Sequence, residues 1–497
     1  MTRRTITTIS IVSCALLIAV ACLIFLPKLI DTSEYRHGIA LWLSDRLGRS
    51  VTVGDLTFSV ITGPKVILKD LKIADDPDVS NEPFVTAREV DVSVRLMPLL
   101  LGVIVVDEIV VKDPVVSIIE KDGALMNLVT LSDGTNPGIS IDVLKASLFD
   151  LKVAPLMGRT ILPDEIRVKN ADVTYVTRPA DAEPEKIIRI KEMDIKITRI
   201  EAAKPPGAGR SQMPSIPFSG DIFISISTGS AKELAFDGLI LTGKIRDDTL
   251  RIDEMEASIF GGKLEVSGYC NMAPLKKELV VNARLTDAMA DRLLTIIRKD
   301  ENTCFGVLNF EGTFTATGKT TAEMVDNLSG EGLIRIEDGH IPAFNIRTEL
   351  SSLGLISNDE MTTVLDTSFS IIGGSFVLSG NRFVTSKLAI KSEEWDAVIK
   401  GEIKLTGVVD FNGNLFLSHT MALNIKPEYI ASLLQNPTGR LSLPISVTGD
   451  VGNLEFLLRP EFLTEKDTDE IFEEFKREIK ERYEEGYSVK FFNRISF

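Results

Sequence analysis

Apolar and polar residues alternate over most of the chain, and this period of two constrains its fold more than any other feature. Val90 to Leu96 is one example, with every second residue apolar. Similar alternation is found at Met193/Ile195/Ile197, Ile222/Ile224/Ile226, Leu279/Val281/Ala283/Leu285 and Ile399/Gly401/Ile403/Leu405. Successive side chains of a β-strand point to opposite faces of its sheet, so these segments predict strands with one dry and one wet face.

Turn signals separate these segments. Thr62-Gly63-Pro64, Lys121-Asp122-Gly123 and Asn412-Gly413 are examples, and their spacing of about ten residues is typical of consecutive hairpins. We therefore expect about 20 to 25 strands, mostly antiparallel. Helical spacing predicts only short helices, at Tyr35–Leu47 (closed by Gly48), Thr286–Arg298, Thr320–Leu328, Phe344–Leu355 and Pro427–Leu434.

One N-terminal segment, residues 6–26, contains no charged residue and reaches the roughly 20 residues that cross a bilayer core. Arg3 and Arg4 precede it, which favours a cytoplasmic N-terminus. The bilayer contacts would come from Ile6, Leu16, Leu17, Leu23, Phe25 and Leu26. We predict an uncleaved anchor with the rest of the chain beyond the membrane, which in a bacterium is the periplasm. A cleaved signal peptide and lipidation at Cys22 are the alternatives.

Composition divides the 497 residues into a stub and anchor (1–30), a first β region (31–203), a Pro/Gly-rich linker or loop (204–217), a second β region (218–460) and a charged tail (461–497). The tail carries apolar residues spaced by four, Ile471, Phe475, Ile479 and Tyr483, which predict an amphipathic helix. That helix could pack on the β region, dock a partner protein or lie on a membrane. Its many acidic residues disfavour the last of these.

The composition and motifs argue against several function classes. A net charge of −16 disfavours nucleic-acid binding. The three histidines, His37, His340 and His419, lack metal-ligand spacing, and no nucleophile elbow, phosphate loop or dinucleotide fingerprint occurs. We expect neither an enzyme nor a cofactor. Carboxylates such as Asp91 and Asp194 fall on polar strand positions and are expected to be solvated.

The four cysteines divide into two pairs. Cys14 and Cys22 lie in the apolar N-terminal segment, and Cys270 and Cys304 lie in strand-like stretches. We expect the second pair to be buried free thiols, with a disulfide as the alternative.

The order of these elements resembles the AsmA family of bacterial envelope proteins. After the anchor and short helix, the resemblance rests on these blocks: Leu47–Val53, Val66–Ile73, Ala87–Val92, Leu96–Gly102, Val106–Ile119, Ile259–Leu264, Leu328–Gly332, Ile336–Ile341 and Leu443–Gly449. Asn127-Leu128 departs from the Asn-Trp of many relatives. The resemblance implies an inner-membrane anchor, a periplasmic body and a part in outer-membrane assembly. It also implies kinship with bridge-like lipid transfer proteins, whose repeating β-grooves carry phospholipid, and older descriptions of the family speak of outer-membrane protein targeting.

These observations lead to a hypothesis about the β region. A long twisted antiparallel sheet would curl into an elongated groove, lined by residues that include Val90, Val92, Val94, Leu96, Ile222, Ile224, Ile226, Leu279, Val281 and Leu285. Burying an acyl chain there recovers about 0.8 kcal/mol per methylene. In the alternative structure the same residues fill a dry core between two packed sheets. The alternative function is a non-enzymatic scaffold for envelope assembly factors, docked through the C-terminal helix.

Overall fold

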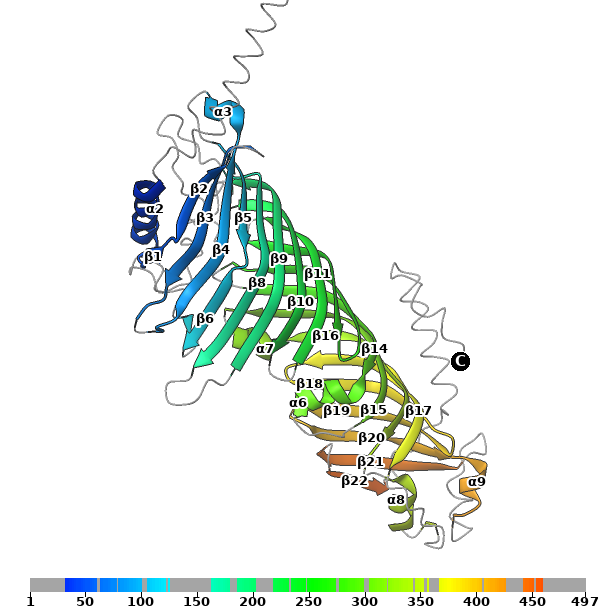
Figure 1. Cartoon of the computed structure of the whole chain (residues 1–497). Coiled ribbons are helices and arrows are strands. Elements are labelled where there is room, and N and C mark those ends of the chain that lie inside the picture. The colour runs from blue at the N-terminus through cyan, green and yellow to red at the C-terminus, as the bar shows by residue number, and fades with distance from the viewer. Residues whose placement is uncertain are drawn as a thin grey trace, which may run out of the picture. The chain divides into compact units, whose positions relative to one another are not determined.

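The computed structural model is built mainly of β-strands (Figure 1). It describes residues 32–59, 63–77, 79–100, 105–121, 124–125, 162–178, 186–202, 218–231, 234–246, 248–273, 277–298, 304–319, 321–342, 345–352, 355–356, 366–404, 406–425, 441–450 and 453–458. These residues form 22 strands, within the range expected from the alternation of apolar and polar residues.

The chain packs as two units, and the first comprises Met1–Ala257 and Tyr269–Lys276. Its helices are α2 (Thr32–Leu47) and α3 (Leu96–Leu100). Its strands are β1 (Val51–Thr52), β2 (Asp55–Ser59), β3 (Lys65–Ala74), β4 (Pro83–Val94), β5 (Val106–Lys112), β6 (Val115–Lys121), β7 (Ala124–Leu125), β8 (Glu165–Arg178), β9 (Lys186–Ala202), β10 (Phe218–Ala231) and β11 (Leu234–Arg246). The two units divide within β12 (Thr249–Ile259) and β13 (Gly262–Asn271).

Strand pairing in the first unit is antiparallel except at one place. β5 and β6 lie one after the other between the same two strands. Each of them pairs antiparallel with β4 and parallel with β8. A parallel pair requires a long connection, and residues 126–164 separate β7 from β8. β9 and β10, which flank residues 204–217, pair directly with each other. The segment expected to be a linker or loop therefore joins adjacent strands of one unit.

The second unit comprises Ser258–Gly268 and Lys277–Phe497. From β14 to β22 each strand pairs antiparallel with the next along the chain. The strands are β14 (Lys277–Met289), β15 (Phe305–Gly318), β16 (Ser329–Ile341), β17 (Thr367–Ser379), β18 (Arg382–Lys391), β19 (Trp395–Lys404), β20 (Val408–Leu417), β21 (Ser442–Asp450) and β22 (Asn453–Leu458). Its helices are α6 (Ala290–Arg298), α7 (Thr321–Asp326), α8 (Ile346–Ser352) and α9 (His419–Ala422).

Most expected helices that fall on described residues are present. α2, α7 and α8 lie where helical spacing predicts them, and Gly48 adopts the left-handed φ of 62° that suits a helix C-terminal cap. α6 begins later than expected, because Thr286–Met289 continues strand β14. The sequence did not predict α3 and α9. The expected helix at Pro427–Leu434 and the amphipathic tail lie outside the described residues.

The expected membrane anchor is likewise not covered by the structure. Residues 6–26 lie outside the described residues. Among the helices that are described, none combines the length and the apolar character that crossing a bilayer requires.

Cys270 and Cys304 are both free thiols, as expected, but only Cys304 is fully buried. It packs among Leu285, Ala288 and Leu308. Burial raises the pKa of the Cys304 thiol to about 12, with Asp291 adding to the effect. Cys270 is only partly buried, which corrects the expectation for that residue.

This difference predicts unequal thiol reactivity. At pH 8 the Cys304 thiol therefore stays protonated, and the thiolate is the reactive form. Iodoacetamide should therefore modify Cys270 in the folded protein and leave Cys304 intact until the protein is unfolded, as peptide mass mapping would show. Equal modification of both cysteines under native conditions would contradict the buried position of Cys304.

Candidate functional site

Apolar residues of neighbouring strands face one another across the first unit. In-register partners project to the same face of a sheet, so each row of partners is a line of adjacent side chains. Two rows cross β4, β5, β8, β9, β10 and β11, and a third, shorter row runs from β8 to β11. They are Val92, Ile109, Ile166, Ile197, Ile222 and Gly243; Val90, Val111, Val168, Ile195, Ile224 and Leu241; and Ala171, Met193, Ile226 and Leu239. We call the surface formed by these three rows the apolar face.

The apolar face is packed over at one side and partly open at the other. Val90 and Ile109 belong to a buried cluster that Ile39 and Ala40 of α2 help to cover, and Val92 packs against it. Ile195, Ile197, Ile222 and Ile224 are only partly buried and belong to none of the four buried clusters of the described residues. The β9–β10 part of the face therefore keeps apolar surface in contact with solvent at these four residues.

The opposite face of the same strands is held by ion pairs. Lys112 donates hydrogen bonds to Glu89 and, over 3.1 Å, to Asp91, and the hydrogen bond to Glu89 raises the pKa of Lys112. Asp91 is only 6% exposed and also lies 3.5 Å from Lys65. The expectation that Asp91 is simply solvated is therefore wrong.

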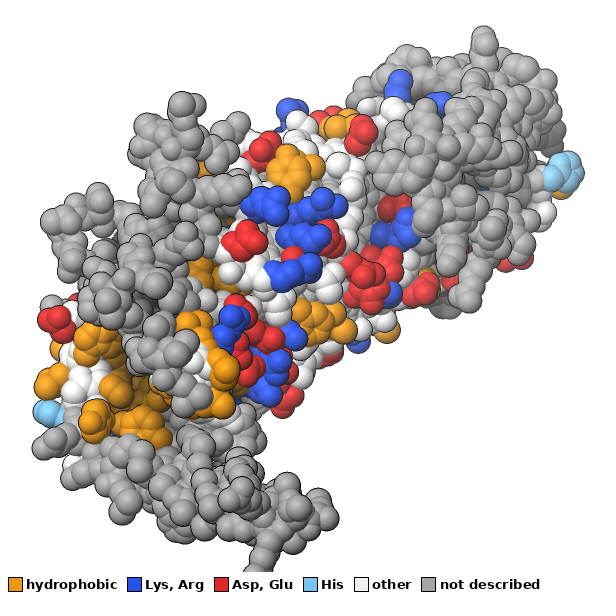
Figure 2. All heavy atoms as spheres, turned by 90° about the horizontal axis from the view of Figure 1, so that it is seen from above, with side chains coloured by type: hydrophobic (Ala, Val, Ile, Leu, Met, Phe, Trp, Pro, Cys, Tyr) orange, Lys and Arg blue, Asp and Glu red, His pale blue; other side chains and the backbone are white. Residues whose placement is uncertain are grey.

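The ion pairs continue onto β8 and β9. Arg167 lies 3.2 Å from Glu108 and also pairs with Glu165, which in turn lies 3.4 Å from Lys196. The hydrogen bond from Arg167 lowers the pKa of Glu165. Figure 2 shows acidic and basic side chains side by side on one face of the molecule rather than a patch of one sign. A face with mixed charge of this kind is solvated, whereas the other face of the same strands is apolar.

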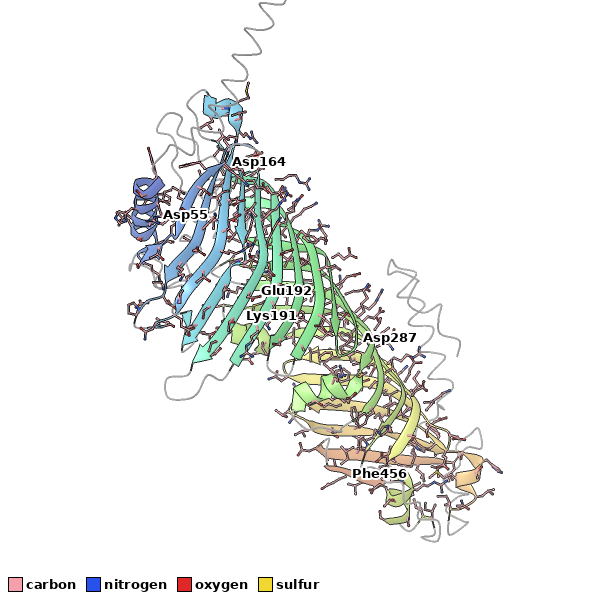
Figure 3. The ribbon with its side chains drawn as sticks, in the orientation of Figure 1. Asp55, Asp164, Lys191, Glu192, Asp287 and Phe456 are labelled. Carbon is pink, nitrogen blue, oxygen red and sulfur yellow. The ribbon has the colours of Figure 1, made fainter. Side chains whose placement is uncertain are left out.

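A line of residues in left-handed conformation crosses the strands of the first unit. Asp70 in β3, Asp113 between β5 and β6, Asn170 in β8, Glu192 in β9 and Gly238 in β11 all have φ between 49° and 61°. Figure 3 labels Glu192 and its neighbour Lys191, about midway along β9. We call this set the left-handed line.

Side-chain hydrogen bonds tie the left-handed line together. Asn170 donates to Asp113 over 2.6 Å, and Arg88 donates to the same carboxylate over 2.5 Å. These two donors lower the pKa of Asp113. The backbone N–H of Asn170 donates to Asp194 over 2.7 Å, and that of Glu192 donates to Asp172 over 3.1 Å. The carboxylates of Asp194 and Asp172 thus satisfy backbone N–H groups of the left-handed line.

The left-handed line keeps the apolar side chains on one face. An extra residue in a strand shifts the alternation by one position. Leu68 and Leu71 are three residues apart, yet both pack in the same apolar cluster, on either side of Asp70. Val168 and Ala171, on either side of Asn170, likewise belong to the apolar face. Because all these strands shift together, the apolar face continues past the line.

In the second unit the corresponding surface is filled. One row of partners is Ala288, Leu308, Ile336, Ile372, Ile390, Ala397, Leu415 and Leu443. Ala290 of α6 packs on the β14–β16 part, and Leu350 of α8 and Met421 of α9 pack on the β19–β21 part. Phenylalanine rings also cover glycines of neighbouring strands: a Cβ on Gly330 would lie 2.5 Å from the Phe314 ring.

The residues expected to line a groove are thus brought together in two separate groups. Val90, Val92, Ile222, Ile224 and Ile226 share the apolar face of the first unit, and Val94 lies partly buried at the end of β4. Leu96 is not in a strand, because it begins α3, and it is 45% exposed. In the second unit Leu279 and Val281 are partly buried, whereas Leu285 is 1% exposed. The expected docking residues 471–483 lie outside the described residues.

The described residues offer little to acid–base or metal chemistry. They contain no group of three or more His, Cys, Asp or Glu side chains that could hold a metal ion. His340 stacks on Phe305 with ring centroids 4.6 Å apart and lies 3.9 Å from Asp366. An aromatic contact and a long ion pair are ordinary structural roles for a surface histidine.

Comparison with known proteins addresses the first unit. No curated protein gives a significant match to the sequence. The model of the AsmA family matches residues 1–242. Over these residues the chain belongs to the AsmA family. The AsmA match therefore contains β4, β5, β8, β9 and β10 in full and ends within β11, one residue before Gly243. The blocks near residues 259, 328 and 443 lie beyond it.

The structure explains one AsmA-like block in physical terms. Arg49, from Leu47–Val53, is buried and donates a 2.5 Å hydrogen bond to the equally buried Asp75. Its guanidinium also lies 5.4 Å from the centre of the Phe84 ring. Arg49 thereby ties the turn after α2 to the end of β3 and the start of β4. Its role in this AsmA protein is to close one edge of the sheet.

The left-handed line predicts opposite effects for two adjacent substitutions. A non-glycine residue at positive φ costs about 1–2 kcal/mol, so Glu192→Gly should stabilise the first unit by about 1 kcal/mol. Lys191→Gly, one residue earlier in ordinary strand conformation, should destabilise it by about 0.5–1 kcal/mol. The midpoint of urea unfolding, followed by circular dichroism of the full-length AsmA protein in detergent, measures both. Destabilisation of equal size by the two glycines would contradict the strain assigned to Glu192.

Proposed function

We propose that this chain is a non-enzymatic, membrane-anchored envelope protein that binds phospholipid acyl chains on the apolar face of its first unit. The observation that carries the proposal is the continuity of that face. Two of its rows cross six strands and the third crosses four, all without a charged residue, and Ile195, Ile197, Ile222 and Ile224 of β9 and β10 are only partly buried. AsmA family membership over residues 1–242 supports a role in the envelope.

The dimensions of the apolar face suit an acyl chain. Six neighbouring strands have five intervals of about 4.8 Å, so the rows extend for about 24 Å. Half of a bilayer core of about 30 Å, the depth that one leaflet's tails occupy, is about 15 Å. The part of the rows beyond the cover of α2, from β8 to β11, spans three of these intervals, about 14 Å, which is close to the length of one tail. The rows consist mainly of Ile and Val, whose similar shapes would leave no deep trap along the path.

The energetics also suit a carrier. Burial recovers about 0.8 kcal/mol per methylene, so a tail of about 16 carbons could recover on the order of 10 kcal/mol. That value approaches what the tail loses on leaving a bilayer, so transfer would be nearly balanced. Such a carrier would need no catalytic group. In this proposal residues 6–26 hold the protein in a bacterial inner membrane, the body lies in the periplasm, and the C-terminal segment contacts another envelope protein.

The sharpest test compares two neighbouring residues of β10. Ile224 lies on the apolar face outside the buried clusters, whereas Phe223 projects to the opposite face beside Lys196 and is 39% exposed. Ile224→Asp should abolish phospholipid that co-purifies with the full-length protein, because a carboxylate is costly to bury against acyl chains. Phe223→Asp should leave the lipid in place. Native mass spectrometry of protein released from detergent measures the bound lipid.

Ile224 is a better choice than Val92 or Leu285, because those two pack in or against buried clusters and their loss would threaten folding. Circular dichroism of both variants provides the folding control. A folded wild-type protein without phospholipid, or equal lipid retention by the two variants, would contradict the proposal and leave the scaffold role as the better explanation.

A further inference from the structure

The first unit presents an exposed apolar tip at one end of its sheet. α3 connects β4 to β5, and Figure 1 shows it beyond the ends of these strands. Leu96 is 45% exposed and Met97 is 73% exposed. The chain continues from this helix with Leu101-Gly102-Val103-Ile104-Val105, which contains no polar side chain. Large exposed apolar side chains gathered on one short helix call for a partner surface.

The start of α2 lies at this same end of the sheet. Tyr35, in the first turn of α2, contacts Phe58 near the end of β2 with ring centroids 6.4 Å apart. The next residue of β2, Ser59, pairs with Lys65, which in turn pairs with Ser93 near the end of β4. α3 begins three residues after Ser93. The register thus places the beginning of α2 and the apolar tip at the same end of the strands of the first unit.

The sequence before α2 indicates that a bilayer lies near this end of the strands. Only residues 27–31 separate the apolar segment 6–26 from Thr32, where α2 begins. The six steps from residue 26 to residue 32 span at most about 22 Å, so a bilayer that holds residues 6–26 must lie within that distance of the start of α2. Tyr35 is 58% exposed there, and a tyrosine at this position suits the interface between lipid and water.

We propose that Leu96 and Met97 of α3 insert into the bilayer surface as a second membrane contact, which sets this end of the first unit on the membrane. The partner is a lipid surface rather than a protein. Arg95 is already paired with Asp107 over 3.1 Å and with Asp164, so the contact depends on apolar burial rather than on attraction to anionic headgroups. The inference rests on the anchor in the proposed function but not on lipid binding to the apolar face.

The test uses an environment-sensitive fluorophore in the full-length protein. Cys14, Cys22 and Cys270 are replaced by alanine, and Cys304 is retained because its buried thiol does not react. Met97→Cys is then labelled with a nitrobenzoxadiazole maleimide and reconstituted into phosphatidylcholine vesicles. Val115→Cys is the matched control, because Val115 is 50% exposed and pairs with Thr86, which lies eight residues, or about 26 Å, before Val94 along β4.

The label at residue 97 should show blue-shifted emission, at least a two-fold loss of intensity with lipids doxyl-labelled near the headgroup, and no change with salt. The label at residue 115 should respond only to aqueous iodide. Equal iodide quenching at both positions, or failure of the protein to float with vesicles, would overturn the proposal. The outcome is independent of lipid bound at Ile224, so failure of this contact and failure of lipid carriage can be told apart.

Discussion

The facing of aliphatic side chains across successive strands is the interaction on which the rest of the first unit depends. A slip of one residue in any strand would turn its isoleucines and valines to the wet side. The register avoids this from β4 to β11, and the ion pairs of Asp91, Lys112 and Arg167 stabilise the same register from the other face. The more exposed of these pairs contribute little energy each.

The left-handed line shows how the aliphatic side chains stay on one face of the sheet over long strands. β9 has 17 residues, and a strand of that length must twist and bend within a sheet. Adding one residue at equivalent points of neighbouring strands bends them without separating their apolar rows. The strain of positive φ at Asp113, Asn170 and Glu192 is offset by hydrogen bonds that would be lost in a straight strand.

Alternating apolar and polar residues give both units an apolar surface, but the two surfaces are covered to different extents. In the second unit α6, α8, α9 and several phenylalanine rings cover the apolar surface, so it is a filled core. In the first unit α2 covers only the β1–β5 part, and Ile195, Ile197, Ile222 and Ile224 of β9 and β10 remain partly exposed. Groove lining and core packing, which are alternatives at the level of sequence, both occur in this chain, each in its own unit.

Alternation alone predicted the strands, their approximate number and five of the residues that share the apolar face (Val90, Val92, Ile222, Ile224 and Ile226), because side-chain direction in a strand depends only on local geometry. It could not predict the parallel pairing of β5 and β6 with β8, since that depends on where a long connection returns. It also missed α3, because Leu96 continues the alternation of β4 although the strand ends at Val94. In β8 the consecutive polar residues Lys169 and Asn170 break the alternation between Val168 and Ala171, and this was the available signal for the left-handed line.

The most direct test of the account is photo-crosslinking in living cells. Benzoylphenylalanine placed at Ile224 in the full-length protein should form a covalent adduct with phospholipid, detected by mass spectrometry of the purified chain. The same residue at Phe223, on the opposite face of β10, should form none. Phospholipid adducts of equal yield at both positions, or at neither position in a folded and membrane-anchored protein, would contradict the claim that the apolar face carries lipid.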